Sequence, residues 1–93
     1  MKYHNFIEFI KKEVTRHVSP EHQVIIQPFI KNNGATYDGL LITDPLLNIS
    51  PAIYLNPYYH RYLNGLSLDE ICTDILNTYY ENLPKKDFDV SLF

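Results

Sequence analysis

Apolar side chains recur with a helical period over residues 3–17. They share one face of a helix, and charged side chains occupy most of the opposite face. Ser19 precedes a proline, and the residue before a proline is disfavoured in the helical conformation. The pattern therefore predicts an amphipathic first helix that ends near Ser19 and packs against another element. Its apolar face consists of Tyr3, Phe6, Ile7, Ile10, Val14 and His17.

The spacing of apolar residues changes to two at about residue 22. Val24, Ile26 and Ile30 then lie on one side of a strand expected over residues 22–31. Pro28 lies inside this strand, and a proline has no N–H to donate to a β-ladder. The strand is therefore expected at the edge of a sheet or with a bulge at Pro28.

A hairpin is expected directly after this strand. Asn33 and Gly34 both tolerate positive φ, and this dipeptide is the strongest short signal for a β-hairpin. The returning strand is expected over residues 35–43. Gly39, in its middle, indicates a β-bulge or the close approach of another group to the backbone.

A third strand is expected over residues 52–55, followed by a short helix and a long helix. Asn56 and Pro57 predict the start of the short helix, with the asparagine as N-cap and the proline in the first turn. Ser67 and Glu70 have the spacing of a capping box, which predicts the start of the long helix.

The order of these elements predicts a single α+β domain over residues 1–84. Strands joined by short links pair antiparallel, which gives a three-stranded meander. The helices are expected to pack on one face of this sheet because both long helices are amphipathic. Residues 85–93 form a tail with alternating apolar residues. This tail is expected either to lead into a further region of a longer protein or to dock on a partner.

Composition and charge exclude some classes of function. The chain has 93 residues, a net charge of −3 and one cysteine. Nucleic-acid binding requires a basic surface, so no nucleic-acid partner is expected. No apolar run approaches the length of a membrane span and no signal-peptide pattern is present, so a cytoplasmic protein without membrane contact is expected.

Few residues are suited to catalysis or metal binding. The four histidines are scattered, and no pair has the helical spacing of two metal ligands. They are His4, His17, His22 and His60. Cys72 lies on the apolar stripe of the last helix, where a buried thiol is the simplest interpretation. The sequence therefore predicts no catalytic residue, no metal and no cofactor.

The most unusual group of side chains lies around the start of the short helix. Side chains four residues apart share a helix face, so part of this group is expected to pack inward. The remainder would form an exposed aromatic and cationic patch, which is typical of protein–protein contact sites. Structural packing and a recognition surface are the two interpretations. The group comprises Tyr54, Tyr58, Tyr59, His60, Arg61 and Tyr62.

Three short motifs have a recognisable order along the chain. They are KNNG at residues 31–34, DGL at residues 38–40 and P-x-IYLN at residues 51–56, followed by Tyr58, Tyr59 and Tyr62. The motifs resemble the opening segment of a family of cytoplasmic bacterial proteins of unknown function. The resemblance implies a protein that continues past residue 93, and it implies no activity, cofactor or substrate.

Two hypotheses about function remain open. The first is a non-enzymatic protein-interaction or accessory module that binds a protein partner or a second copy through its strand edge or its tyrosine-rich helix. The second is part of an enzyme domain whose site combines Tyr58, His60 and Asp38 and is completed by residues outside this chain. A deep pocket lined by those three side chains would favour the second hypothesis.

Overall fold

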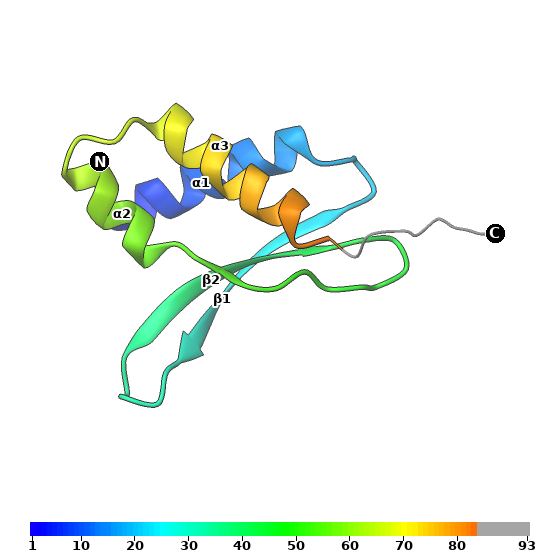
Figure 1. The fold of residues 1–93 in the computed structure, drawn as a ribbon, viewed down its shortest axis with the longest axis horizontal. Helices are drawn as coiled ribbons and strands as arrows, with labels where there is room; N and C mark the ends of the chain where they lie inside the picture. The colour runs from blue at the N-terminus through cyan, green and yellow to red at the C-terminus, as the bar shows by residue number, and fades with distance from the viewer. Residues whose placement is uncertain (84–93) are drawn as a thin grey trace.

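The computed structural model describes residues 1–83 and has the predicted order of elements. The sheet order is β1-β2-β3, and both strand pairs are antiparallel. The predicted α+β class and three-stranded meander are therefore confirmed, whereas the predicted tail at residues 85–93 lies outside the described residues. The elements are α1 (Tyr3–His17), β1 (Gln23–Ile30), β2 (Thr36–Thr43), β3 (Ile53–Tyr54), α2 (Asn56–Leu63) and α3 (Leu68–Glu81) (Figure 1).

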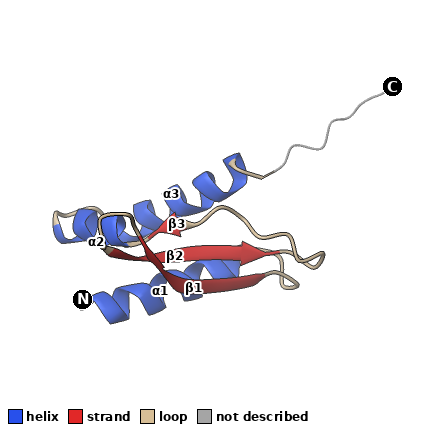
Figure 2. Ribbon diagram, turned by 90° about the horizontal axis from the view of Figure 1, so that it is seen from below, coloured by secondary structure: helices blue, strands red, loops and turns tan. Residues whose placement is uncertain are grey.

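The helices lie on one face of the sheet, and the core forms between them. Figure 2 shows the strands in front of α1 and α3, with no helix covering the near face. Val24 of β1 and Leu40 and Ile42 of β2, all at even-numbered positions, point towards the helices and are buried with them. This arrangement confirms that the helices pack on one face. The fully or almost fully buried residues are Phe6, Ile10, Val14, Leu40, Ile42, Leu55, Ile71 and Ile75.

The two later helices begin in different ways. The Ser67 hydroxyl accepts a hydrogen bond from the Glu70 N–H at 3.1 Å, so the predicted capping box of α3 is confirmed. The predicted asparagine cap of α2 is wrong, because Leu55 occupies the N-cap position. The Asn56 Oδ1 instead accepts from the Asp38 N–H at 2.8 Å, which ties the start of α2 to β2.

The predicted β1–β2 hairpin is present, and residues 32–34 form its three-residue connection. The Lys31 N–H donates to the Ala35 carbonyl at 2.8 Å, and the Gly34 N–H donates to the Lys31 carbonyl at 2.9 Å. Gly34 has φ +84°, whereas Asn33 does not have a positive φ. A single left-handed glycine is sufficient for this next commonest type of hairpin.

The neighbourhood of Gly39 settles the two alternatives for that residue. The β1–β2 pairing runs through Gly39 without interruption, so no bulge forms there. The Phe29 ring lies directly over Gly39, and a Cβ on the glycine would be 2.5 Å from the Phe29 Cε1. The close approach that the sequence predicted is therefore made by an aromatic side chain.

Candidate functional site

Two of the predicted patch residues, Tyr59 and Tyr62, pack between α2 and α1. Their ring centroids lie 5.1 Å and 5.6 Å from that of Phe6. The Tyr59 hydroxyl also donates to the Met1 carbonyl at 2.8 Å. Both side chains are half-buried. These two tyrosines therefore hold α2 against the N-terminal helix.

Three other patch residues remain near the surface, and two of them, Tyr58 and Arg61, connect α2 to α3. The Tyr58 hydroxyl donates to the Asp74 carboxylate at 2.6 Å, and an Arg61 nitrogen lies 3.7 Å from the same carboxylate oxygen. The Arg61 guanidinium is also 5.2 Å from the centroid of the Tyr58 ring. Burial raises the pKa of Tyr58 to about 12, and the hydrogen bond and charge of Asp74 add to this effect. His60 is exposed beside them.

Tyr54 lies apart from the other five residues, on the face of the sheet opposite the helices. Its ring centroid is 5.8 Å from that of Phe29 and 5.5 Å from that of Tyr37. The Lys31 Nζ lies 4.0 Å from the Tyr54 centroid, within the range of a cation–π interaction. We call Phe29, Lys31, Tyr37 and Tyr54 the outer-face cluster.

The outer face continues past this cluster as an apolar surface that no helix covers (Figure 2). Ile25 and Leu41 are direct partners in the β1–β2 register and point to this side. Ile25 remains 38% exposed. The sequence predicted no function for this face of the sheet. The signal that could have found it is the presence of Ile25, Phe29 and Leu41 at odd-numbered positions, since a strand with one solvated face usually has polar residues there.

β1 is an edge strand, as Pro28 predicted. Lys31 and Ala35 form a hydrogen-bonded pair at the end of the hairpin. Hydrogen-bonded and non-hydrogen-bonded pairs alternate along an antiparallel ladder. The odd-numbered residues of β1 therefore form their main-chain hydrogen bonds with β2. On β2, the main-chain groups of Asp38 and Ile42 bond away from β1, which agrees with this alternation. The main-chain groups of the even-numbered residues of β1 therefore point to the free edge. Pro28 is one of these residues, so its missing N–H does not remove a hydrogen bond between β1 and β2.

The residues of the enzyme hypothesis have separate partners. Asp38 accepts a hydrogen bond from the Tyr3 hydroxyl at 2.5 Å, and burial together with this bond and the Asp38 charge raises the pKa of Tyr3. Tyr58 bonds to Asp74 instead. Asp38, Tyr58 and His60 do not line the hollows beside α1, beside α3 or at the β2–β3 connection. The geometry gives this hypothesis no shared site.

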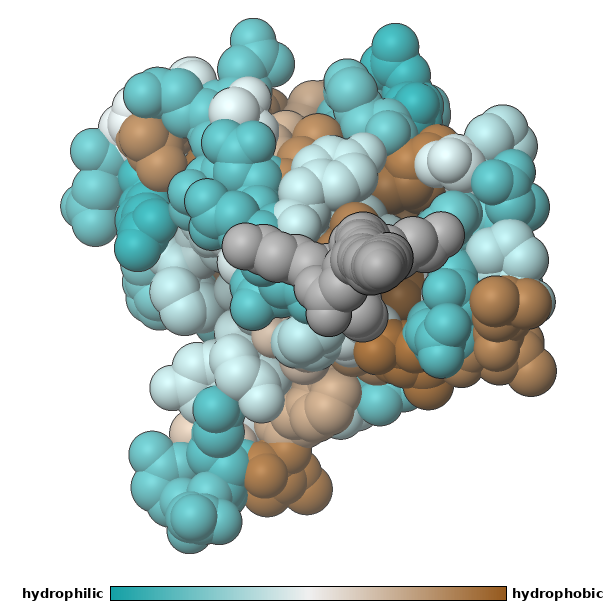
Figure 3. Space-filling model, turned by 45° about the vertical axis from the view of Figure 1, so that its right-hand side comes forward, coloured by the Kyte–Doolittle hydropathy of each residue, from teal (hydrophilic) through white to brown (hydrophobic). Residues whose placement is uncertain are grey.

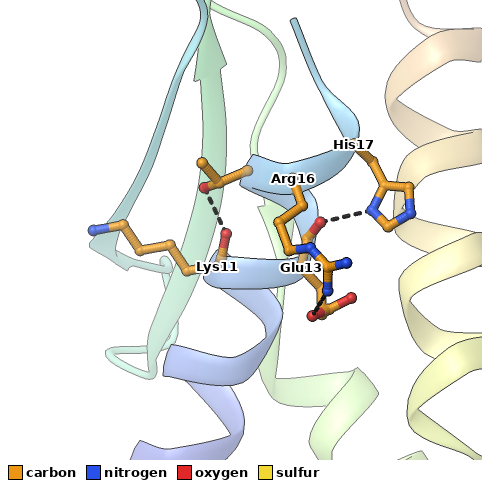
Figure 4. Close-up of polar contacts among 5 residues, drawn as sticks. Lys11, Glu13, Arg16 and His17 are labelled. Atoms are coloured by element: carbon orange, nitrogen blue, oxygen red, sulfur yellow. Dashed lines mark hydrogen bonds and ion pairs between the residues drawn. The ribbon is translucent and has the colours of Figure 1, made fainter. Parts of the chain in front are cut away.

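The other histidines serve local structure or stand alone. The His17 Nδ1 donates to the Glu13 carbonyl at 2.8 Å, and Arg16 pairs with the Glu13 carboxylate at 2.9 Å, in the last turns of α1 (Figure 4). The His22 Nδ1 is buried and has no hydrogen-bond partner among residues 1–83. No group of three or more His, Cys, Asp or Glu in that part of the chain is placed to hold a metal ion.

The comparison with protein families gives one result. The profile of a family of unknown function (DUF5688) matches residues 3–93. The chain belongs to this family. The match confirms the resemblance noted in the sequence. Membership of DUF5688, a family of unknown function, does not indicate a particular activity. Comparisons with curated proteins and with solved structures found no match. Within residues 1–83, no helix of this DUF5688 chain is both long enough and apolar enough to cross a bilayer.

Proposed function

We propose that this DUF5688 chain is a non-enzymatic protein-interaction module that binds an extended segment of a partner protein along β1. The outward main-chain groups of Val24 and Ile26 carry this proposal, because no described residue forms a hydrogen bond with them. A partner strand would form ladder bonds with these groups, as in β-augmentation. Pro28 supports the same position, because its carbonyl can still accept a bond from the added strand.

The outer face and the charge at the end of β1 indicate the chemistry of the partner. Alternate side chains of an added strand would lie beside Ile25 and Phe29 on the apolar outer face. β1 itself has no charged residue, and Lys31 follows it directly. The partner segment is therefore expected to alternate apolar residues and to carry an acidic residue opposite Lys31.

The size of the outer face argues against a permanent dimer formed by stacking two copies. β1 and β2 have eight residues each and span roughly 27 Å. The sheet is about 10 Å wide where the two-residue β3 is present, so the face offers at most on the order of 300 Å². Stable interfaces bury about 800 Å² on each partner. A transient partner that also uses the main-chain groups of the edge fits this area better.

A peptide titration tests the proposal. The probe is an eight-residue peptide with valine at alternate positions and one glutamate near its end, added to the ¹⁵N-labelled chain and followed by NMR. We expect shifts at the amides of β1. Ile25→Asp should reduce binding by placing a charge on the outer face. Leu63→Asp is the matched control, because Leu63 is 59% exposed on α2, away from the sheet.

Two results would contradict the proposal. Shifts centred on Tyr58, His60 and Arg61 rather than on β1 would assign recognition to the exposed side of α2. Equal binding by a peptide whose alternate backbone nitrogens are methylated would exclude ladder hydrogen bonds as the source of affinity.

A further inference from the structure

A hollow of about 290 Å³ lies between the β2–β3 connection and the C-terminal end of α3. Ile42, Ile49 and Pro51 line one side, and Tyr79 and Leu83 line the other. A dry cavity of roughly 150 Å³ already holds a benzene molecule in other proteins. The space is therefore large enough for one aromatic side chain.

Tyr79 supplies a polar group to this hollow. Its side chain is only 6% exposed, and its hydroxyl has no hydrogen-bond partner among residues 1–83. The neighbouring Asp44 carboxylate accepts from the main-chain N–H groups of Leu46 and Asn48 and forms no hydrogen bond with Tyr79 among residues 1–83. Burial, followed by the nearby Tyr80 and Asp44, raises the pKa of Tyr79, so its hydroxyl stays protonated. The lining of the hollow thus includes a protonated hydroxyl that forms no hydrogen bond with another residue of 1–83.

The turn beside the hollow presents apolar side chains to solvent. Leu46, Leu47 and Ile49 are 83%, 78% and 66% exposed. Leu47 has φ +65°, a conformation that is strained for a bulky residue. Figure 3 shows hydrophobic surface on the side of the molecule where this connection lies. An apolar turn held in a strained conformation next to an apolar hollow has the features of a docking surface.

We propose that residues 84–93, which follow α3, dock on this surface, with the Phe88 ring in the hollow and the Tyr79 hydroxyl donating to a main-chain carbonyl of that segment. The start of the segment favours this occupant, because Leu83 lines the hollow and the segment follows Leu83 directly in the sequence. Phe88 is five residues further on, a reach of up to roughly 17 Å. A short tether gives an effective concentration of about millimolar.

Charge and residue pattern fit the same occupant. Lys85 and Lys86 follow Pro84 and complement the Asp44 carboxylate at the edge of the hollow. Phe88 then begins an alternation of apolar residues, which would give an extended segment one apolar side. Asp87 and Asp89 lie on the other side of this alternation. The proposal is independent of the proposed binding at β1, because it uses a different part of the surface.

NMR on the 93-residue chain tests the docking. We expect nuclear Overhauser contacts between the Phe88 ring and the methyl groups of Ile42 and Ile49. Phe88→Ser should abolish these contacts and shift the resonances of both methyl groups. Asp87→Ser is the matched control and should leave the same resonances unchanged. Both substitutions lie outside the described fold, so loss of the core does not confuse the result.

Absence of any contact from Phe88 to Ile42 or Ile49 would overturn the proposal. A mixture of differently labelled chains separates the two possible origins of a contact. Contacts found only between chains would assign the surface to a second copy and would overturn docking within one chain. Tyr79→Phe tests the hydroxyl, and unchanged resonances throughout residues 84–93 would overturn its role as donor.

Discussion

Replacing Gly39 with alanine should destabilise the fold because of one side chain, that of Phe29. Gly39 pairs with Gln27 on one side and with Tyr54 on the other, at the centre of the sheet. An added Cβ would lie 2.5 Å and 2.7 Å from two carbons of the Phe29 ring, and 3.3 Å from the Ala52 Cβ. Carbon atoms in favourable contact are about 3.5–4.0 Å apart. The ring would therefore have to move by about 1 Å and would lose part of its contact with Tyr54.

The expected cost is the difference between two opposing effects. Overpacking of this kind typically costs about 1–3 kcal/mol. Alanine also restricts the unfolded chain relative to glycine, which raises the free energy of unfolding by roughly 0.5–1 kcal/mol. Gly39→Ala should thus lower the free energy of unfolding by about 1–2 kcal/mol. In a Phe29→Ala background the overpacking is absent, so the same substitution should be neutral or stabilising.

Urea unfolding of four proteins measures both effects. The four are the wild type, the two single variants and the double variant, and their free energies form a double-mutant cycle. The expected coupling between positions 29 and 39 is about 2 kcal/mol, with the double variant more stable than additivity predicts. Thermal unfolding should show the Gly39→Ala midpoint lower by at least about 4 °C. An equal cost in both backgrounds would refute the stated cause, as would a Gly39→Ala variant as stable as the wild type.

Four further predictions concern the helices. Ser67→Ala removes the capping box with Glu70 and should cost about 0.5–2 kcal/mol in urea unfolding, and no loss would contradict that cap. Asp74→Asn should lower the pKa of Tyr58 from about 12 but leave it above 10, because burial is the largest cause of the raised value. An unchanged pKa of Tyr58 in an NMR titration would argue against the contact between Tyr58 and Asp74. Because Tyr58 is raised from 10, the stability that depends on its proton should be complete below pH 10 and lost as pH rises through about 12. Burial raises the pKa of Cys72 to about 11, so iodoacetamide should modify the folded chain far more slowly than the urea-unfolded chain at pH 8, and equal rates would contradict burial.

The sequence predicted elements well where one physical effect decides the structure. The helical period of α1 and the capping box at Ser67 gave both long helices, because amphipathic burial and capping act locally. Asn56 was misassigned because its side chain had two possible donors to satisfy. It accepts from Asp38, eighteen positions away in the chain, rather than from its own helix. Such a choice depends on tertiary contacts that a single sequence does not display.

The candidate site was harder to predict than the fold. The sequence shows that Tyr54 is close to Tyr58 along the chain, but the strand turns Tyr54 onto the outer face before α2 begins. Tyr59 and Tyr62 pack on Phe6 because α2 lies against α1, a contact between segments more than fifty residues apart. The uncovered face of the sheet was visible in the odd-numbered positions of the strands. A role for this face could not be predicted, because the sequence does not show which face of the sheet the helices leave uncovered.

Amide hydrogen exchange along β1 of the free chain tests the central claim most directly. The account predicts an alternation, in which Ile25, Gln27 and Phe29 exchange slowly because they bond to β2, while Val24 and Ile26 exchange quickly because they point to an unpaired edge. Equal protection of both sets would show that another segment already pairs with β1, and the proposed docking edge would not exist.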